Sequence, residues 1–249
     1  MSNWRSGVSL PGNIQFGPPK TPRFVWWLIG ALAVAFLFEA ILTQAQPFGE
    51  KIGQPRVLLW FGLQPERVFK GWLWQPLTWM FVHADLRHLL GNVFFLWMFG
   101  GTVAEALGRK RFLLLFLGGG YLAGLLLCVA SLVPLLLGVP MLSWLPYGVP
   151  AVGASGAIFA VITLFGLLFP DRPINLILIP IVFPARLMVP LALLAEYSSS
   201  AGGVSHGAHI AGVIVGLLWW RFVLRRGQSK PPAKRGLRVV GGSDPSIFH

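Results

Sequence analysis

The stretch AVGASGAIFA, residues 151–160, puts a polar side chain, Ser155, between small residues at the start of an apolar segment. That segment runs from Gly153 to Phe169, about 17 residues or roughly 25 Å of helix. The hydrocarbon core of a bilayer is about 30 Å thick. If the PDRP stretch that follows lies at one membrane face, Ser155 begins below the other face. Non-helical backbone at that depth needs protein or a water-filled cavity beside it, so the stretch predicts a recessed, hydrated pocket.

The composition around this stretch is typical of a helical membrane protein. The 249 residues are 55% hydrophobic and only 11% charged, whereas about a quarter of the residues in a soluble domain are charged. The predicted fold class is therefore an all-α membrane protein with six transmembrane helices. We expect these helices at about residues 24–45, 86–107, 112–133, 153–169, 187–197 and 205–224.

The segments between and beyond these helices predict the domain organisation. Residues 46–84 form a long first loop, and its cluster of Trp60, Trp72, Trp74 and Trp79 is typical of a membrane interface. We expect a flexible tail over residues 1–22, a membrane domain over 23–224 and a basic tail over 225–249. GRKR, residues 108–111, predicts a tight basic loop between the second and third helices.

The positive charge of the chain indicates orientation rather than nucleic-acid binding. The formal net charge is +12, but no nucleic-acid-binding motif accompanies it. Lys and Arg concentrate in the tails and in alternate loops, which predicts that both termini are cytoplasmic and that the protein spans the cell membrane several times. We expect the basic C-terminal tail to contact anionic lipid.

In this topology the second, fourth and sixth helices begin on the same outer side of the membrane. Their first turns carry the most unusual polar residues of the chain: His88 and Asn92, Ser155, and His206 and His209. Ionisable residues inside a membrane are costly and mark function by default. We therefore expect the three helix starts to share one functional pocket.

Ser155 has two interpretations at this stage. It could cap its helix, as serine often does. Alternatively, the unpaired N–H groups and the positive dipole of a helix start suit a developing oxyanion, and the flanking Gly153 and Gly156 permit close backbone approach. A serine becomes a nucleophile when an adjacent base takes its proton.

The sixth helix offers such a base. Gly212 and Gly216 lie on the same face as His209, and small residues let two membrane helices approach closely. His209 could therefore reach Ser155, while His206, one turn earlier, is expected at the mouth of the pocket.

The second helix offers hydrogen-bond donors. His88 and Asn92 are spaced i, i+4 and share a face. They could either bind an oxyanion or join helices to each other. No HExxH motif or pocket carboxylate accompanies the histidines, and Glu39 and Glu105 are assigned elsewhere, so we expect no metal and no cofactor.

Three motifs on alternate helices together resemble the rhomboid intramembrane serine proteases. They are HADLRHLLGNVFFLWMFGG at residues 83–101, GASGAIFA at 153–160 and SHGAHIAG at 205–212. The resemblance covers about residues 24–224 and implies a six-helix bundle with a long interfacial first loop.

The same resemblance implies a role for each motif residue. Ser155 would be the nucleophile and His209 the general base, with no acidic third member. His88, Asn92 and the Ser155 N–H would stabilise the oxyanion. Gly153, Gly156, Phe159 and Gly212 would support the site, and His83 would be structural.

Two positions depart from the family pattern. Gln75 follows Trp74 where many members have arginine, which puts the packing of the first loop in question. Phe159 stands where tyrosine is common, so the ring can still stack on the imidazole but has no hydroxyl.

The predicted function is that of an intramembrane serine endopeptidase, which cleaves transmembrane protein substrates near the outer membrane face. The alternative is a catalytically silent rhomboid-like protein that binds membrane clients. A proton or solute transporter would also use buried histidines, but the chain shows no inverted repeats and no pocket carboxylates.

Overall fold

The computed structural model describes residues 21–44, 56–137, 150–176, 179–198 and 206–224. The basic C-terminal tail, nearly all of the N-terminal tail and the middle of the loop at 134–152 lie outside these residues. The first helix, α1, spans Arg23–Gln44. The first loop then forms three short helices, α2 (Arg56–Phe61), α3 (Pro65–Val68) and α4 (Gln75–Thr78), followed by a 3-10 turn at Trp79–Phe81.

The remaining helices carry the motifs. α5 (Leu86–Phe95) continues through a π turn (Leu96–Gly100) into α6 (Gly101–Leu107), and α7 (Arg109–Leu113) continues through Leu114–Gly118 into α8 (Gly119–Ala130) and then α9 (Leu132–Leu136). The later helices are α10 (Ser155–Leu168), α11 (Met188–Ser198) and α12 (His206–Trp219), the last extended by a π turn at Trp220–Leu224.

Three continuous helical stretches of the described chain are long and apolar enough to cross a membrane. They are Arg23–Thr43, Leu86–Leu107 and Arg109–Ala130. Ser155–Leu168 and Ala185–Ala195 are apolar but shorter. The protein is thus a mainly helical membrane protein, and the total of six spans remains a prediction.

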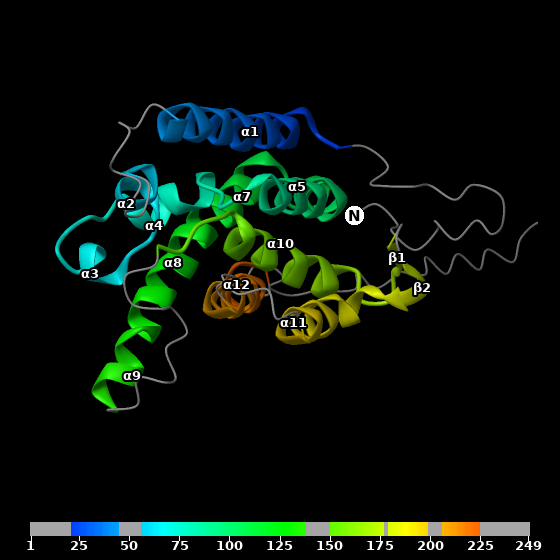
Figure 1. The fold of residues 1–249 in the computed structure, drawn as a ribbon. Coiled ribbons are helices and arrows are strands. Elements are labelled where there is room, and N and C mark those ends of the chain that lie inside the picture. Colours follow the sequence, from blue (N-terminus) through cyan, green and yellow to red (C-terminus); the bar gives the residue numbers. More distant parts are fainter. Residues whose placement is uncertain (1–20, 45–55, 138–149, 177–178, 199–205, 225–249) are drawn as a thin grey trace, which may run out of the picture.

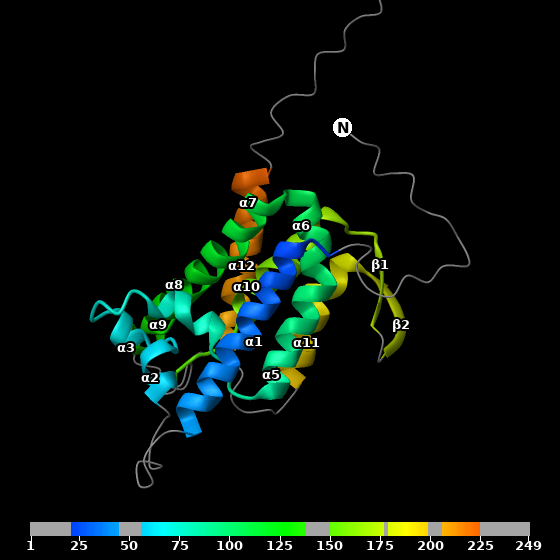
Figure 2. The same ribbon diagram turned by 90° about the horizontal axis from the view of Figure 1, so that it is seen from above.

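Helix α10 lies at the centre of the molecule. In Figures 1 and 2 it runs among α5, α8, α11 and α12, while α1 forms an outer layer against α5. Nearly every side chain of α10 from Gly156 to Gly166 is buried. Phe165 makes an edge contact with Phe99 of the π turn after α5, with ring centroids 4.9 Å apart. Because α10 is apolar around its whole circumference, it is stable only when surrounded in this way.

The glycines of α12 let it lie directly on α10. A Cβ at Gly212 would collide with the backbone oxygen of Gly156. One turn later, a Cβ at Gly216 would lie 2.7 Å from Thr163 Cβ and 2.8 Å from the Ala160 oxygen. The expected close approach of these two helices is confirmed.

Gln75 holds the first loop together. Its side chain is completely buried; Nε2 donates to the Leu59 oxygen at 3.1 Å, and Oε1 accepts from the Gln64 N–H at 3.0 Å. An amide can do both because it carries donors and an acceptor. The first loop is therefore hydrogen-bonded through Gln75, although many family members have arginine at this position.

An arginine at another position, Arg67, also supports this loop. Arg67 Nη1 donates to the Leu59 oxygen at 3.0 Å, and its guanidinium lies 4.5 Å from the ring centroid of Trp72. Trp72 in turn stacks between Trp60 and Trp74, with centroids 4.9 Å apart in both pairs. The charge lies on a face of the aromatic stack, where cation–π attraction holds it.

The all-α expectation is wrong at one point, because a β-hairpin separates α10 from α11. Strands β1 (Pro173–Leu176) and β2 (Ile179–Pro184) pair antiparallel, and an ion pair between Asp171 and Arg186 closes the base of the hairpin. Proline lacks an N–H and is confined to edges and ends of strands, which suits a two-stranded ribbon. Helix α11 begins at Met188, one residue after the predicted start.

The predicted basic loop at 108–111 is also corrected. Gly108, with φ of 76°, is the single residue between α6 and α7. Arg109 and its basic neighbours form the first turn of α7 instead of a loop. Glycine adopts this backbone conformation without steric strain, so one residue suffices for the turn.

The packing of α12 on α10 predicts the effect of a single methyl group. Gly216→Ala should lower the free energy of unfolding by about 1–3 kcal/mol, because the methyl overlaps Thr163 and the Ala160 carbonyl. Gly30→Ala in α1 is the matched control, since a Cβ there meets nothing within 4 Å. Thermal unfolding in detergent measures both, and equal unfolding temperatures would contradict the packing described.

Candidate active site

Ser155 is the first residue of α10 rather than its cap. Ala154 occupies the N-cap position, and no side chain caps this helix. The first backbone bond of the helix runs from the Ile158 N–H to the Ala154 oxygen at 3.0 Å. The N–H groups before Ile158 point out of the helix start without intrahelical partners. The capping interpretation of Ser155 is therefore wrong, and its side chain is partly exposed.

The backbone leading into α10 requires glycine at position 153. Gly153 has φ of 113°, a conformation that residues with a Cβ rarely adopt. A Cβ there would also lie 2.5 Å from His88 Cε1 and 2.6 Å from His88 Nε2. The imidazole of α5 therefore rests against the chain two residues before Ser155.

Asn92 lies beside the same backbone. A Cβ at Gly153 would be 3.5 Å from Asn92 Nδ2, and this nitrogen is buried with no hydrogen-bond partner among the described residues. Buried donors are nearly always paired. An unpaired donor next to a helix start is the arrangement that an oxyanion would complete.

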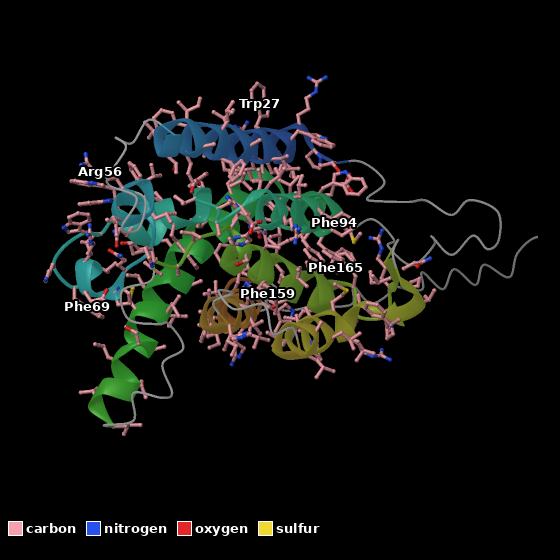
Figure 3. The ribbon with its side chains drawn as sticks, viewed as in Figure 1. Trp27, Arg56, Phe69, Phe94, Phe159 and Phe165 are labelled. Carbon is pink, nitrogen blue, oxygen red and sulfur yellow. The ribbon has the colours of Figure 1, made fainter. Side chains whose placement is uncertain are left out.

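His209 lies over the face of α10 that carries Ser155. Its ring stacks on Phe159 with centroids 4.3 Å apart and planes 13° from parallel. Figure 3 labels Phe159 where α10 and α12 lie side by side. Phe159 is four residues after Ser155 and shares its helix face. The phenyl ring thus makes the expected stack without the missing hydroxyl.

His206 is the first residue of α12 and is exposed. Its expected place at the mouth of a pocket stays a prediction. The described contacts thus place His88 and Asn92 beside Gly153, two residues before Ser155, and His209 on Phe159, one turn after Ser155.

Trp79 is a supporting residue that the sequence analysis misassigned to the membrane interface. Its side chain has no exposed surface, and its carbonyl accepts a hydrogen bond from the Gly153 N–H at 2.8 Å. A Cβ at Gly156 would lie 3.1 Å from the Trp79 ring. Trp79 therefore supports the helix start from below. Its sequence signal, one tryptophan among several, could not separate a core position from an interfacial one.

Two residues before α5 orient His88. Asp85 caps the helix, accepting from the His88 N–H at 2.8 Å, and this bond holds the pKa of the Asp85 carboxyl below its usual range. His83 packs edge-on against the His88 ring, with centroids 5.2 Å apart.

Glu39 lies beside the segment that leads into α5. Although α1 carries it, its Oε2 accepts from the His83 N–H at 3.1 Å. A carboxylate therefore reaches the segment leading into the site. The signal for it was present in the sequence, because ionisable residues inside membrane spans rarely lack a role.

Comparison with known proteins shows similarity to one family. A model described as the Rhomboid domain matches residues 70–226, which is more than half of the chain. "Rhomboid protein 1, mitochondrial" of Saccharomyces cerevisiae is 32% identical over 168 residues, covering 65% of this chain and 44% of the yeast protein.

Two further relatives extend the comparison. "Presenilin-associated rhomboid-like protein A, mitochondrial" of Danio rerio is 26% identical over 144 residues, 56% of this chain and 34% of that protein. "Rhomboid protease GlpG" of Yersinia pestis is 28% identical over 152 residues, 59% of this chain and 46% of that protein. The chain spans less than half the length of each of the three.

Alanine substitutions at Gly153 and Gly71 distinguish the cost of backbone strain from the cost of displacing the His88 ring. Both have positive φ, 113° and 97°, but a Cβ at Gly71 meets nothing within 4 Å. Gly71→Ala should lower the free energy of unfolding by about 1–2 kcal/mol through strain alone. Gly153→Ala should lower it further, because the methyl also displaces His88. Thermal unfolding in detergent compares them, and equal losses would mean that His88 does not rest on Gly153.

His83 predicts a pH dependence of stability. Burial, helped by the neighbouring His88, lowers the pKa of His83 from 6.5 to about 4. Between these values the unfolded chain binds more protons than the folded one. Stability should therefore be complete above about pH 6.5 and fall by roughly 3 kcal/mol as the pH drops to about 4.

The measurement for this prediction is unfolding in detergent across that pH range. His83→Gln cannot titrate and should flatten the pH dependence. A slope unchanged by the substitution would assign the effect to other groups.

Proposed function

The chain belongs to the rhomboid family, and we propose that it is an intramembrane serine endopeptidase with a Ser155–His209 dyad. The observation that carries this proposal is the stack of His209 on Phe159, which sets an imidazole over the helix face of the serine. Inactive relatives of such enzymes need the fold alone, whereas an imidazole stacked one turn from Ser155 supports a general-base role for His209.

The proposed reaction follows from the groups around Ser155. His209 takes the hydroxyl proton as Ser155 Oγ attacks the scissile carbonyl carbon. The resulting oxyanion accepts hydrogen bonds from the Ser155 N–H, Asn92 Nδ2 and His88. His209 then gives its proton to the leaving amine, and a water molecule hydrolyses the acyl-enzyme by the same steps.

The oxyanion pocket is proposed on the strength of its unpaired donor. Asn92 Nδ2 is buried without a partner among the described residues, and such donors are worth most when water is excluded. A tetrahedral oxyanion would satisfy this group, whereas a planar peptide in the ground state would not reach it as well. Differential binding of this kind is what accelerates a reaction.

The proposed substrates are transmembrane proteins cut near the outer membrane face. A helical peptide bond is shielded by its own hydrogen bonds, so the substrate must unwind at the cleavage site. Six spans, cytoplasmic termini and the cell membrane remain our proposal for the topology, on the evidence of the positive-inside bias. We retain residues 23–224 as the membrane domain, between a flexible N-terminal tail and a basic C-terminal tail proposed to contact anionic lipid.

Contact with the bilayer is supported by the outer face of α1. Trp27 is 78% exposed and points away from the bundle (Figure 3). Val34 and Leu37 on the same helix are also mostly exposed. An apolar face of this size is stable against lipid and unfavourable against water.

A fluorophosphonate probe tests the proposed activity, because only an activated serine reacts readily with it. Ser155→Ala and His209→Ala should each reduce labelling and cleavage of a model transmembrane substrate by about 1000-fold or more. Ser131→Ala is the matched control, since Ser131 instead donates to the Cys128 carbonyl. His206→Ala is the corresponding histidine control, because His206 lies at the exposed start of α12.

The same experiment separates the alternative function. A catalytically silent client-binding protein would bind transmembrane segments, yet the wild type would neither label nor cleave. Cleavage that persists in Ser155→Ala would contradict the proposed Ser155–His209 dyad.

A further inference from the structure

Glu39 is a carboxylate within the first membrane-spanning helix. The α1 sequence is apolar for about four turns before Glu39 and for three residues after it, and a charge in such a segment is costly. Its Oε2 accepts from the His83 N–H at 3.1 Å, and a hydrogen bond to a charged acceptor is stronger than a neutral one. The bond joins α1 to the short segment between the first loop and α5.

The packing of α1 does not require this carboxylate. Val25 and Leu32 of α1 are completely buried against the rest of the bundle, and Phe24 makes an edge contact with Phe112 at 5.8 Å. These apolar contacts hold the first half of α1 in place, and Phe36, one turn before Glu39, also packs against the core. Glu39 adds one directed bond, and that bond ends on His83.

His83, which Glu39 holds through its N–H, contacts a residue of the proposed oxyanion pocket. Its side chain is 1% exposed, and its ring meets the His88 ring edge-on at 5.2 Å and 69°. His88 in turn lies against Gly153. Asp85 is exposed and fixes the His88 backbone through the His88 N–H. The orientation of the His88 ring thus depends on where His83 is held.

We propose that Glu39 is a positioning residue for His88. By holding the His83 amide, it keeps the His83 ring against the His88 ring and so keeps His88 over the start of α10. The inference rests on the proposed function, since it assigns α1 to the catalytic pocket of the peptidase. It extends the site to a helix outside the matched family domain, which begins at residue 70.

Four substitutions test the proposal in the full chain. Glu39→Gln keeps an acceptor oxygen at the same reach, and its kcat should stay within about twofold. Glu39→Met keeps the length but removes the acceptor, and Glu39→Asp keeps the charge but retracts it. Both should lower kcat for a model transmembrane substrate roughly tenfold with little change in KM, because the lost bond acts on the transition state. Glu105→Met, at an exposed carboxylate of α6, should have no effect.

A double-mutant cycle with His88→Ala separates positioning from general support of the fold. If Glu39 acts through His88, Glu39→Met should cause little further loss once His88 is absent. Independent losses that multiply would overturn the proposal. Glu39→Gln as damaging as Glu39→Met would overturn it too, because the acceptor oxygen would then not be the important feature.

A readout that needs no activity distinguishes this inference from the proposed function. The chain has five histidines, so selective 15N-histidine labelling gives an NMR spectrum that single substitutions can assign. Glu39→Met and Glu39→Asp should shift the His83 amide and the His88 ring signals, while Glu105→Met should shift neither. Unchanged His88 ring signals would overturn the positioning role even in a fully active enzyme. Shifted signals in a protein without cleavage would support the role and refute the peptidase.

Discussion

The direct packing of α12 on α10 is the contact on which the arrangement of the site depends. It requires glycine at positions 212 and 216 of α12, where a Cβ would meet the backbone oxygens of Gly156 and Ala160 in α10. Because Ser155 and Phe159 lie on α10 and His209 lies one turn before Gly212, the same contact brings the imidazole onto the phenyl ring. In lipid, close van der Waals packing of this kind replaces the hydrophobic effect as the force between helices.

The second half of the site comes from the chain that approaches α5. Trp79 supports Gly153 from one side through its carbonyl, while His88 rests on Gly153 from the other. The absence of a side chain at Gly153 makes the second contact possible, because a Cβ there would lie 2.5 Å from His88 Cε1. The site is therefore assembled around a short non-helical segment, and its shape depends on buried groups from the first loop and from α5. Such a segment is stable at membrane depth only when protein surrounds it.

The first loop is joined by a buried amide at the position where the family pattern suggests an arginine. Gln75 accepts from the Gln64 N–H and donates to the Leu59 carbonyl, so it joins three parts of the loop. It can do so because an amide carries both donors and an acceptor. Positive charge is supplied by Arg67, which lies over Trp72 and also donates to the Leu59 carbonyl.

The sequence by itself determined the class of the protein, the long apolar helices and the candidates Ser155, His209, His88 and Asn92. These follow from composition, helical periodicity and motif spacing, which are local properties of the chain. Tertiary structure alone decided that Ser155 does not cap its helix, that Trp79 lies in the core and that Glu39 reaches His83. It also decided that residues 173–184 form a hairpin. Each of these depends on which side chain meets which backbone group across a distance of many residues, and periodicity contains no information about such pairings.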